Sequence, residues 1–164
     1  MPVLAAGPGA AAAALWNLAH GTSQVLVLPA GAVLPSRIVV LPGAEAGVES
    51  LGVAASLLRH IPAESVLLEI HDGATPERER ASCLRLLLDA RARAQLEHQL
   101  DLRTELRFGD LDAELERELG KDPNSMLVLG LDTLEEDETA RLAGLLEEPR
   151  LRPVPLVRSP AGAD

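Results

Sequence analysis

The chain has 164 residues, a formal net charge of −10 and an apolar content of 47%, enough for one well-formed core or for one domain and a fragment of another. The negative charge would repel nucleic-acid backbones and anionic membrane surfaces, and two aromatic residues, Trp16 and Phe108, are too few for a base-stacking platform. We therefore expect no nucleic-acid partner.

The single cysteine, Cys83, rules out a disulfide within the chain and is typical of a protein from a reducing compartment. The apolar N-terminal segment lacks the basic residues with which a signal peptide begins, so it does not resemble one. No stretch approaches about 20 uncharged apolar residues, the length of a membrane span. We expect a cytoplasmic location, either of the whole protein or of a domain of a membrane protein.

The first 36 residues predict a small helix–strand piece. Residues 2–6 favour a strand, and Gly7-Pro8-Gly9 a turn. A short helix is expected over residues 10–20 and a strand over residues 25–28, followed by a linker.

From residue 37 on, apolar runs of strand length alternate with helical patterns. Strands are predicted at residues 38–41, 66–70, 102–108, 126–129 and 154–157, and helices at 46–60, from 75 to about 100, at about 110–119 and after 133. This alternation predicts an α/β fold with a doubly wound, mainly parallel five-stranded sheet, to which the N-terminal helix–strand piece is added.

The longest predicted helix begins with Thr75 as N-cap and Pro76 in the first helical position. Cys83 lies within this helix, and no neighbouring charge pattern marks its thiol as reactive, so we expect it to be buried or half-buried and inert. The helical period places an apolar row on one side, formed by Ala81, Leu84, Leu88, Ala92 and Leu96.

The last strand, residues 154–157, contains Pro155 and follows Pro153. Two prolines two residues apart remove N–H donors from the same side of a strand, so we predict an edge strand or a swapped one. We expect this edge near Val154–Val157 to mediate homodimer or tandem-domain packing.

The chain also contains an internal echo. Residues 2–29 and residues 125–160 each run through a strand, a glycine turn, a helix, an apolar strand and a proline. We therefore interpret residues 1–34 as the tail of a preceding copy with its linker, residues 35–160 as the main domain, and residues 161–164 as a disordered tail.

In its order of elements and its motifs, most of the chain resembles the universal stress protein family. Members have five parallel strands, a long second helix, a Gly-Asp-like turn before a short third helix, a glycine ending the fourth strand and a last strand at a dimer edge. The matching segments here are RIVVLPGAE (37–45), FGD (108–110), SMLVLG (125–130) and RPVPLV (152–157), and HGTSQVLVLP (20–29) is similar to the family's entry into its final strand.

The sequence departs from the glycine pattern that ATP-binding members of this family carry. The first glycine is present as Gly130, but Thr133 and Ala143 stand where the second and third would be. The acidic residue expected after the first strand is replaced by Gly43, with Glu45 the nearest substitute. Five acidic residues follow Gly130, at positions 132 and 135–138, and would repel a triphosphate. The resemblance thus implies the fold and argues against a nucleotide cofactor.

The remaining candidate residues indicate no catalytic or metal site. His71-Asp72 follows a predicted strand, but without a nucleophile we interpret the pair as a turn. The other histidines show no metal-ligand spacing, and no G-x-S-x-G, Walker A or H-E-x-x-H motif occurs. Thr133 is interpreted as the cap of the last helix.

The sequence therefore predicts a non-enzymatic regulatory or oligomerisation domain of universal stress protein type, without catalytic residues, metal or cofactor. Cytoplasmic tails of cation/proton antiporters and other transporters carry such paired domains. The resemblance therefore implies that this chain could be the cytoplasmic domain of a transporter, with the membrane part of that transporter as its partner. The alternative is a stress protein that binds an adenine nucleotide through an altered phosphate loop, with Gly43, Glu45, Gly130 and Thr133 at the site.

Overall fold

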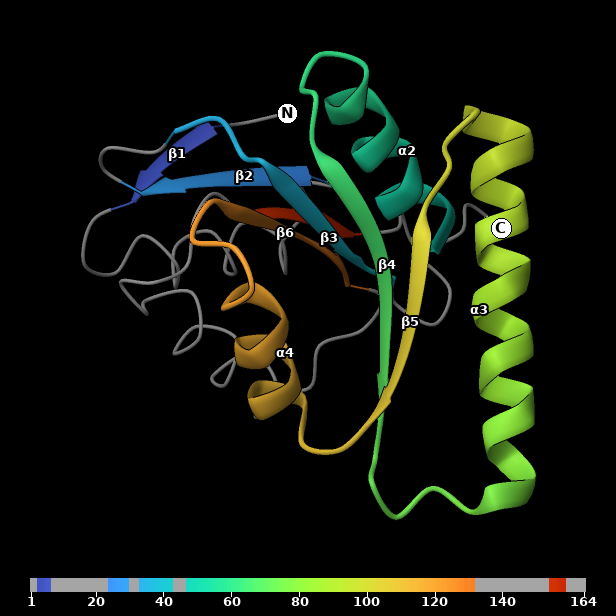
Figure 1. The fold of residues 1–164 in the computed structure, drawn as a ribbon. Coiled ribbons are helices and arrows are strands. Elements are labelled where there is room, and N and C mark those ends of the chain that lie inside the picture. Colours follow the sequence, from blue (N-terminus) through green and yellow to red (C-terminus); the bar gives the residue numbers. More distant parts are fainter. Residues whose placement is uncertain (1–2, 7–23, 30–32, 43–46, 132–153, 159–164) are drawn as a thin grey trace.

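The computed structural model of the chain describes residues 3–6, 24–29, 33–42, 47–131 and 154–158. In these ranges the chain forms one twisted sheet flanked by helices (Figure 1). The strands are β1 (Val3–Ala6), β2 (Gln24–Pro29), β3 (Arg37–Leu41), β4 (Glu64–His71), β5 (Arg103–Phe108), β6 (Ser125–Leu131) and β7 (Val154–Arg158). The helices are α2 (Gly47–Leu58), α3 (Glu77–His98) and α4 (Leu111–Leu119).

The described strands lie in the order β1-β2-β7-β6-β3-β4-β5, and all neighbours are parallel except β2 and β7. The predicted α/β class with a mainly parallel sheet is confirmed. The predicted number of strands is wrong, because β1 and β2 join the same sheet and bring it to seven described strands rather than five. The interpretation of residues 1–34 as part of a preceding copy stays a prediction, as do the domain bounds.

Strand β7 does not lie at an edge of the described sheet, so the prediction of an edge strand is wrong. The alternative of a swapped strand and the homodimer or tandem-domain packing near Val154–Val157 stay predictions. It pairs in parallel with β6 on one side and antiparallel with β2 on the other. The pairing with β6 involves only Leu156, Val157 and Arg158, which follow both prolines. Pro155 is opposite Leu26 of β2. The missing N–H groups therefore precede the segment that pairs with β6, and the strand accommodates a neighbour on each side.

Helices cover both faces of the sheet, with α2 and α3 on one side and α4 on the other (Figure 1). Strand β3 is buried along Ile38, Val39 and Val40, as expected of a parallel strand covered on both faces. The larger core lies under α2 and α3 and includes Ile38, Val40, Leu51, Val53, Ala54, Leu67, Leu87, Ala90, Ala94, Met126 and Val128. On the other face, Leu115 of α4 is fully buried, and α4 contacts β4 and β6.

Helix α3 buries a different side from the one that the larger apolar residues form. Cys83, Leu87, Ala90 and Ala94 are buried against α2 and the sheet. The row from Ala81 to Leu96 is exposed instead. Small side chains at Ala90 and Ala94 allow the helix to approach its neighbours closely, which explains why the alanine side is the inner one. The predicted burial of Cys83 is confirmed.

The predicted cap of α3 is not formed. The N-cap residue is Pro76 and makes no side-chain cap hydrogen bond, while the hydroxyl of Thr75 donates to the carbonyl oxygen of Asp72 over 2.6 Å. At the other end, Gln99 adopts a left-handed conformation with φ of 58°. The N–H of Gln99 donates to the carbonyl oxygen of Gln95 over 3.1 Å, and the N–H of Leu100 donates to that of Ala94 over 3.2 Å. None of the helices in the described ranges combines the length and apolar character that a bilayer crossing requires.

Candidate functional site

The nucleotide site considered in the sequence falls mostly outside the described residues. This applies to Gly43, Glu45 and Thr133. Gly130 is described and lies next to the carboxyl end of β6, where it pairs with Val157 of β7. Strand β6 also lies beside β3, with Leu129 opposite Leu41. The strand order reverses at β3, between β4 and β6, and such a reversal is where doubly wound folds bind ligands.

A second group of polar residues lies at the carboxyl ends of β4 and β5. The Nε2 atom of His71 is 2.8 Å from Oε1 of Glu69, and the imidazole stacks on the ring of Phe108 with 6.0 Å between the ring centroids. The guanidinium of Arg80, from α3, also lies over the ring of Phe108, 4.6 Å from its centroid. Histidine, ring and guanidinium thus form one stacked cluster that joins α3 to the strand ends.

The turn after His71 is held by local hydrogen bonds. The side chain of Asp72 accepts from the N–H of Ala74 over 2.8 Å, and the N–H of Gly109 donates to the carbonyl oxygen of His71 over 2.9 Å. The interpretation of His71-Asp72 as a turn agrees with these contacts. The side-chain partner of His71 is a carboxylate and not a hydroxyl or thiol. This arrangement orients the imidazole but provides no activated nucleophile.

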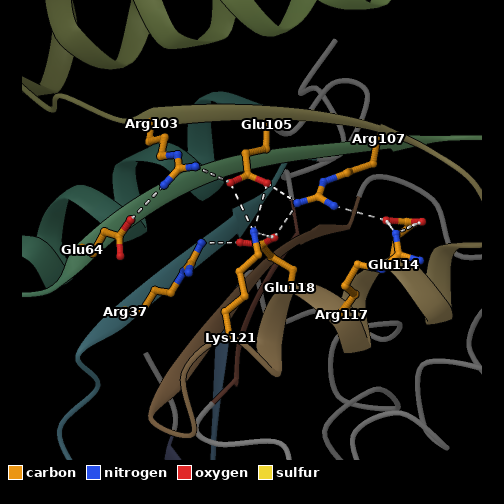
Figure 2. Close-up of polar contacts among 9 residues, drawn as sticks. All are labelled: Arg37, Glu64, Arg103, Glu105, Arg107, Glu114, Arg117, Glu118 and Lys121. Atoms are coloured by element: carbon orange, nitrogen blue, oxygen red, sulfur yellow. Dashed lines mark hydrogen bonds and ion pairs between the residues drawn. The ribbon is translucent and has the colours of Figure 1, made fainter.

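A large cluster of charged side chains lies between α4 and the sheet (Figure 2). At its centre is Glu118, whose carboxylate is fully buried. One of its oxygens accepts from Arg37, and the other lies 3.0 Å from Arg107 and 2.5 Å from Lys121. A buried carboxylate is retained in charged form only where cations and hydrogen bonds compensate for lost hydration. Three cations supply that compensation here.

Arg37 is the other buried member of the cluster, with 7% of its side chain exposed. It opens β3, and only its terminal nitrogen bonds to Glu118; its Nε atom is buried without a hydrogen-bond partner. A guanidinium in this position depends on Glu118 for its main compensating charge.

The cluster extends outward along β5. Glu105 bonds to Arg107 and lies 3.2 Å from the ammonium of Lys121, and Arg103 approaches it to 3.3 Å. Burial acts to raise the pKa of Glu105, but the hydrogen bonds from Arg107 and Lys121 outweigh it and hold that pKa below its ordinary value. The hydrogen bond with Glu105 in turn raises the pKa of Arg107. The pair is therefore charged throughout the neutral range.

On α4 itself, Glu114 is buried, and both of its carboxylate oxygens accept from one nitrogen, Nη1 of Arg117, at 2.6 and 2.7 Å. Asp110 caps this helix by accepting from the N–H of Ala113 over 3.1 Å. Carboxylates near the N-terminus and cations near the C-terminus suit the helix dipole. Glu114 also lies 3.6 Å from Arg107 of β5, so this carboxylate, like that of Glu118, joins α4 to the sheet.

The part of this cluster around Arg37, Arg103 and Lys121 lies at the opposite end of the sheet from the usual ligand site of this fold class. Arg37 and Arg103 are the first residues of their strands, and Lys121 belongs to the turn that leads into β6. In doubly wound folds, ligands bind at the carboxyl ends of the strands. The charges also pair with one another, so we interpret the cluster as the polar core that attaches α4.

The sequence pattern alone does not predict this cluster. The alternation of Arg103, Glu105 and Arg107 was visible and indicates a polar face, but it does not reveal that α4 covers that face. The one signal was Arg37 at the start of an otherwise apolar strand, which requires a carboxylate partner if it is buried.

A depression of about 580 Å³ lies at the amino ends of β4 and β5, beside α3. Its charged side chains are paired across it, Arg91 with Asp101 at 3.1 Å and Arg103 with Glu64 at 3.7 Å. Within the described ranges, no group of three or more His, Cys, Asp or Glu side chains is arranged to hold a metal ion. These features provide no distinct ligand or metal site.

No family model and no curated protein sequence matches the chain. Solved structures do resemble it, among them two universal stress proteins. A universal stress protein from Archaeoglobus fulgidus DSM 4304 superposes with a TM-score of 0.60 at 10% identity, over 90% of this chain and 54% of that one. A protein of the universal stress protein family from Burkholderia pseudomallei superposes with a TM-score of 0.50 at 21% identity, over 78% of this chain and 98% of that one.

The chain spans about half the length of the Archaeoglobus protein. At these identities the likeness concerns the fold and not the activity. It agrees with the expectation drawn from the order of elements and from the segments 37–45, 108–110 and 125–130. The chain therefore has an α/β fold of the universal stress protein type.

Proposed function

We propose that the chain is a non-catalytic association domain of universal stress protein type, which acts by binding another protein surface. The observation that carries the proposal is the exposed apolar row on α3. Its large members, Leu84, Leu88 and Leu96, face solvent although their helix packs tightly on the sheet through its other side. Aligned apolar side chains on a surface helix are a feature of interaction surfaces.

The arrangement of charged groups supports a non-catalytic role. The buried carboxylates Glu114 and Glu118 pair with arginine side chains of β3 and β5, which holds α4 on the sheet. His71 bonds to Glu69 and stacks on Phe108. These contacts fix elements of structure and leave none of these groups positioned as a base next to a nucleophile.

The regulatory part of the proposal follows from the family resemblance. In the cytoplasmic part of a membrane transporter, association of two such domains would bring two transport subunits together. This role predicts that a variant that no longer associates still folds but no longer regulates the transporter.

Sedimentation velocity over a concentration series up to tens of micromolar tests the proposal. We expect the average sedimentation coefficient to rise with concentration from the monomer value towards that of a dimer. A monomer throughout this range would contradict the association role. Circular dichroism of the same samples checks that the protein is folded.

The alternative is a small-ligand binder that holds an adenine nucleotide at the carboxyl ends of β3 and β6. The reversal of strand order at β3 favours it, since this is where doubly wound folds bind nucleotides. It predicts a rise in melting temperature with ATP or AMP and magnesium, and loss of that rise in Gly130→Val. An unchanged melting temperature at millimolar nucleotide would eliminate it.

A further inference from the structure

The first two described strands repeat the arrangement of the last two. Strands β1 and β2 pair in parallel, with Val3 opposite Leu26. Strands β6 and β7 also pair in parallel, with Leu129 opposite Leu156. The sequence shows the same echo, because the segments that contain these strands share an order of apolar runs, glycine and proline. The strand pairing and the sequence pattern thus agree that the two strand pairs are versions of one unit.

A local two-fold rotation relates the two units. They occupy the order β1-β2-β7-β6 in the sheet, so the later strand of each unit lies inside and the earlier strand outside. The inner strands run antiparallel, with Val25 opposite Leu156 and Val27 opposite Val154. Reversal of both strand order and strand direction corresponds to a two-fold axis perpendicular to the sheet, between β2 and β7. Two identical subunits in an isologous contact are joined by the same symmetry.

The symmetry shows what β2 replaces. Without β1 and β2, β7 would be an edge strand of the described sheet, because its other side pairs with β6. An open strand edge presents unpaired N–H and C=O groups that accept a further strand. A second copy with an equally open β7, placed by the same axis, would put its β7 in the position of β2 and its β6 in that of β1.

We infer that β1 and β2 form an internal cap, which occupies the place of the β7 and β6 of a second copy and is held by its own chain. Two chains then join through β7 only after the cap is released. The inference goes beyond the proposed function, because that function concerns the exposed row of α3 and the cap concerns the edge of β7.

The contacts of the cap allow such a release. Within the described residues, its main contact with the rest of the chain is the pairing of β2 with β7. The described residues of the larger core all lie between Ile38 and Val128. Detachment of the cap should therefore leave the main part of the chain folded.

The connection to the main sheet favours a cap held by its own chain. Residues 30–36 join β2 to β3, which lies three positions from β2 in the sheet. At about 4.8 Å between neighbouring strands this is a distance of roughly 14 Å. An extended segment of that length reaches about 23 Å. Strand β2 runs antiparallel to β7, β6 and β3, so its end lies on the side where β3 begins. The connection is therefore long enough within one chain.

A pair of cysteines tests whether the cap and β7 belong to the same chain. Val25 and Leu156 are direct partners, and the Cα atoms of such partners lie about 4.5 to 5.5 Å apart, within the range of a disulfide. On oxidation, Val25→Cys/Leu156→Cys should link within one chain, as non-reducing electrophoresis and peptide mass spectrometry detect. Val25→Cys/Val154→Cys is the matched control. Its positions are two residues out of register, about 7 to 8 Å apart, and should link far less.

Proline substitution in β2 tests the release. Consecutive residues of a strand direct their N–H groups to opposite sides, so Val25→Pro/Leu26→Pro removes a donor on each side and should detach the cap. The edge of β7 is then free for the β7 of a second copy. Sedimentation velocity should show a dissociation constant at least about tenfold lower than that of the parent protein. Val25→Ile/Leu26→Ile keeps both N–H groups and should sediment like the parent.

Each outcome decides the inference. A disulfide between two chains would overturn a cap held by its own chain, and absence of any link would overturn the pairing of β2 with β7. A folded proline variant that sediments like the parent would overturn the place assigned to a second copy. Loss of the cooperative unfolding of that variant, followed by circular dichroism, would also overturn the inference, because release should leave the main core intact.

One further variant separates the cap from the proposed function. Leu88→Glu alters the exposed row of α3 and leaves β7 unchanged. The gain in association caused by the two prolines should persist in this background, and its loss would overturn pairing through β7. A parent protein that stays monomeric contradicts the proposed function alone, because the disulfide and the effect of the prolines remain as predicted.

Discussion

Glu118 of α4 and Arg37 of β3 form a buried, hydrogen-bonded ion pair across 81 residues of sequence. The pair joins the end of the helix to the start of a central strand, and Arg107 and Lys121 complete the surroundings of the carboxylate. Because both members have lost their hydration, each depends on the other far more than the members of a surface pair do.

Neutralising Glu118 should destabilise the fold strongly. Glu118→Gln keeps the shape of the side chain but leaves the Arg37 guanidinium buried without its counter-charge, so we expect a loss of about 3 kcal/mol. Glu116→Gln, on the exposed side of the same helix, should change stability by less than about 0.5 kcal/mol. Urea denaturation followed by circular dichroism measures both, and equal midpoints for the two variants would contradict the account of the cluster.

Removing both charges should cost less than the single losses suggest. We expect Arg37→Met and Glu118→Leu to destabilise by about 3 kcal/mol each, and the double variant by clearly less than the sum, because no uncompensated charge remains at this pair. A double-mutant cycle on the unfolding free energies measures the coupling. Additive losses would show that the two side chains act independently.

Stability should decrease as the pH falls through the acidic range. The folded-state pKa of Glu105 lies below the ordinary carboxyl value, so its contribution is complete above about pH 5 and is lost as the pH falls towards the lowered pKa. The pKa of Asp122 is also lowered, by the backbone N–H of Asn124 and the hydroxyl of Ser36, and acts with the same sign. Denaturation midpoints at several acidic pH values should show a shallower decline for Glu105→Gln, whereas Glu116→Gln should decline like the parent protein.

Two glycines should respond in opposite directions to alanine. Gly52 lies inside α2, and a Cβ atom there would meet Cε1 of His98 at 3.8 Å, an ordinary contact, so Gly52→Ala should stabilise by about 0.5 to 1 kcal/mol. At Gly109 a Cβ atom would lie 3.1 Å from Oε1 of Glu114, which is bonded to Arg117, so Gly109→Ala should destabilise by about 1 kcal/mol. Thermal denaturation of the two variants measures the difference, and a shift of equal sign would contradict this packing.

Within the described residues, the sequence predicted the elements and the class of the fold well, because local patterns determine them; the helices predicted at residues 10–20 and after 133 lie outside the described residues. The apolar run at Ile38–Val40 and the glycine and proline positions mark strand and turn without reference to the rest of the chain. Tertiary packing decides which side of each helix is buried, and local patterns do not reveal this. On α3 two apolar rows compete, and the one with smaller residues, Ala90 and Ala94, lies inside because it permits closer packing.

Tertiary contacts also decide the position of β7 in the sheet and the burial of the charge cluster. Two prolines in and before β7 predict an edge strand locally, but β2 occupies the free side and β6 pairs only beyond Pro155. Glu118 and Arg37 each look like surface charges in the sequence, and only the position of α4 on the sheet makes them a buried pair. Of the nucleotide-site residues, only Gly130 falls within the described part of the chain.

The central claim is that this domain associates and does not depend on a bound nucleotide. Native mass spectrometry of the protein as purified, at tens of micromolar, tests it most directly. The account predicts a species with the mass of two chains and no added mass. A single chain, or a species that carries the additional mass of an adenine nucleotide, would contradict it.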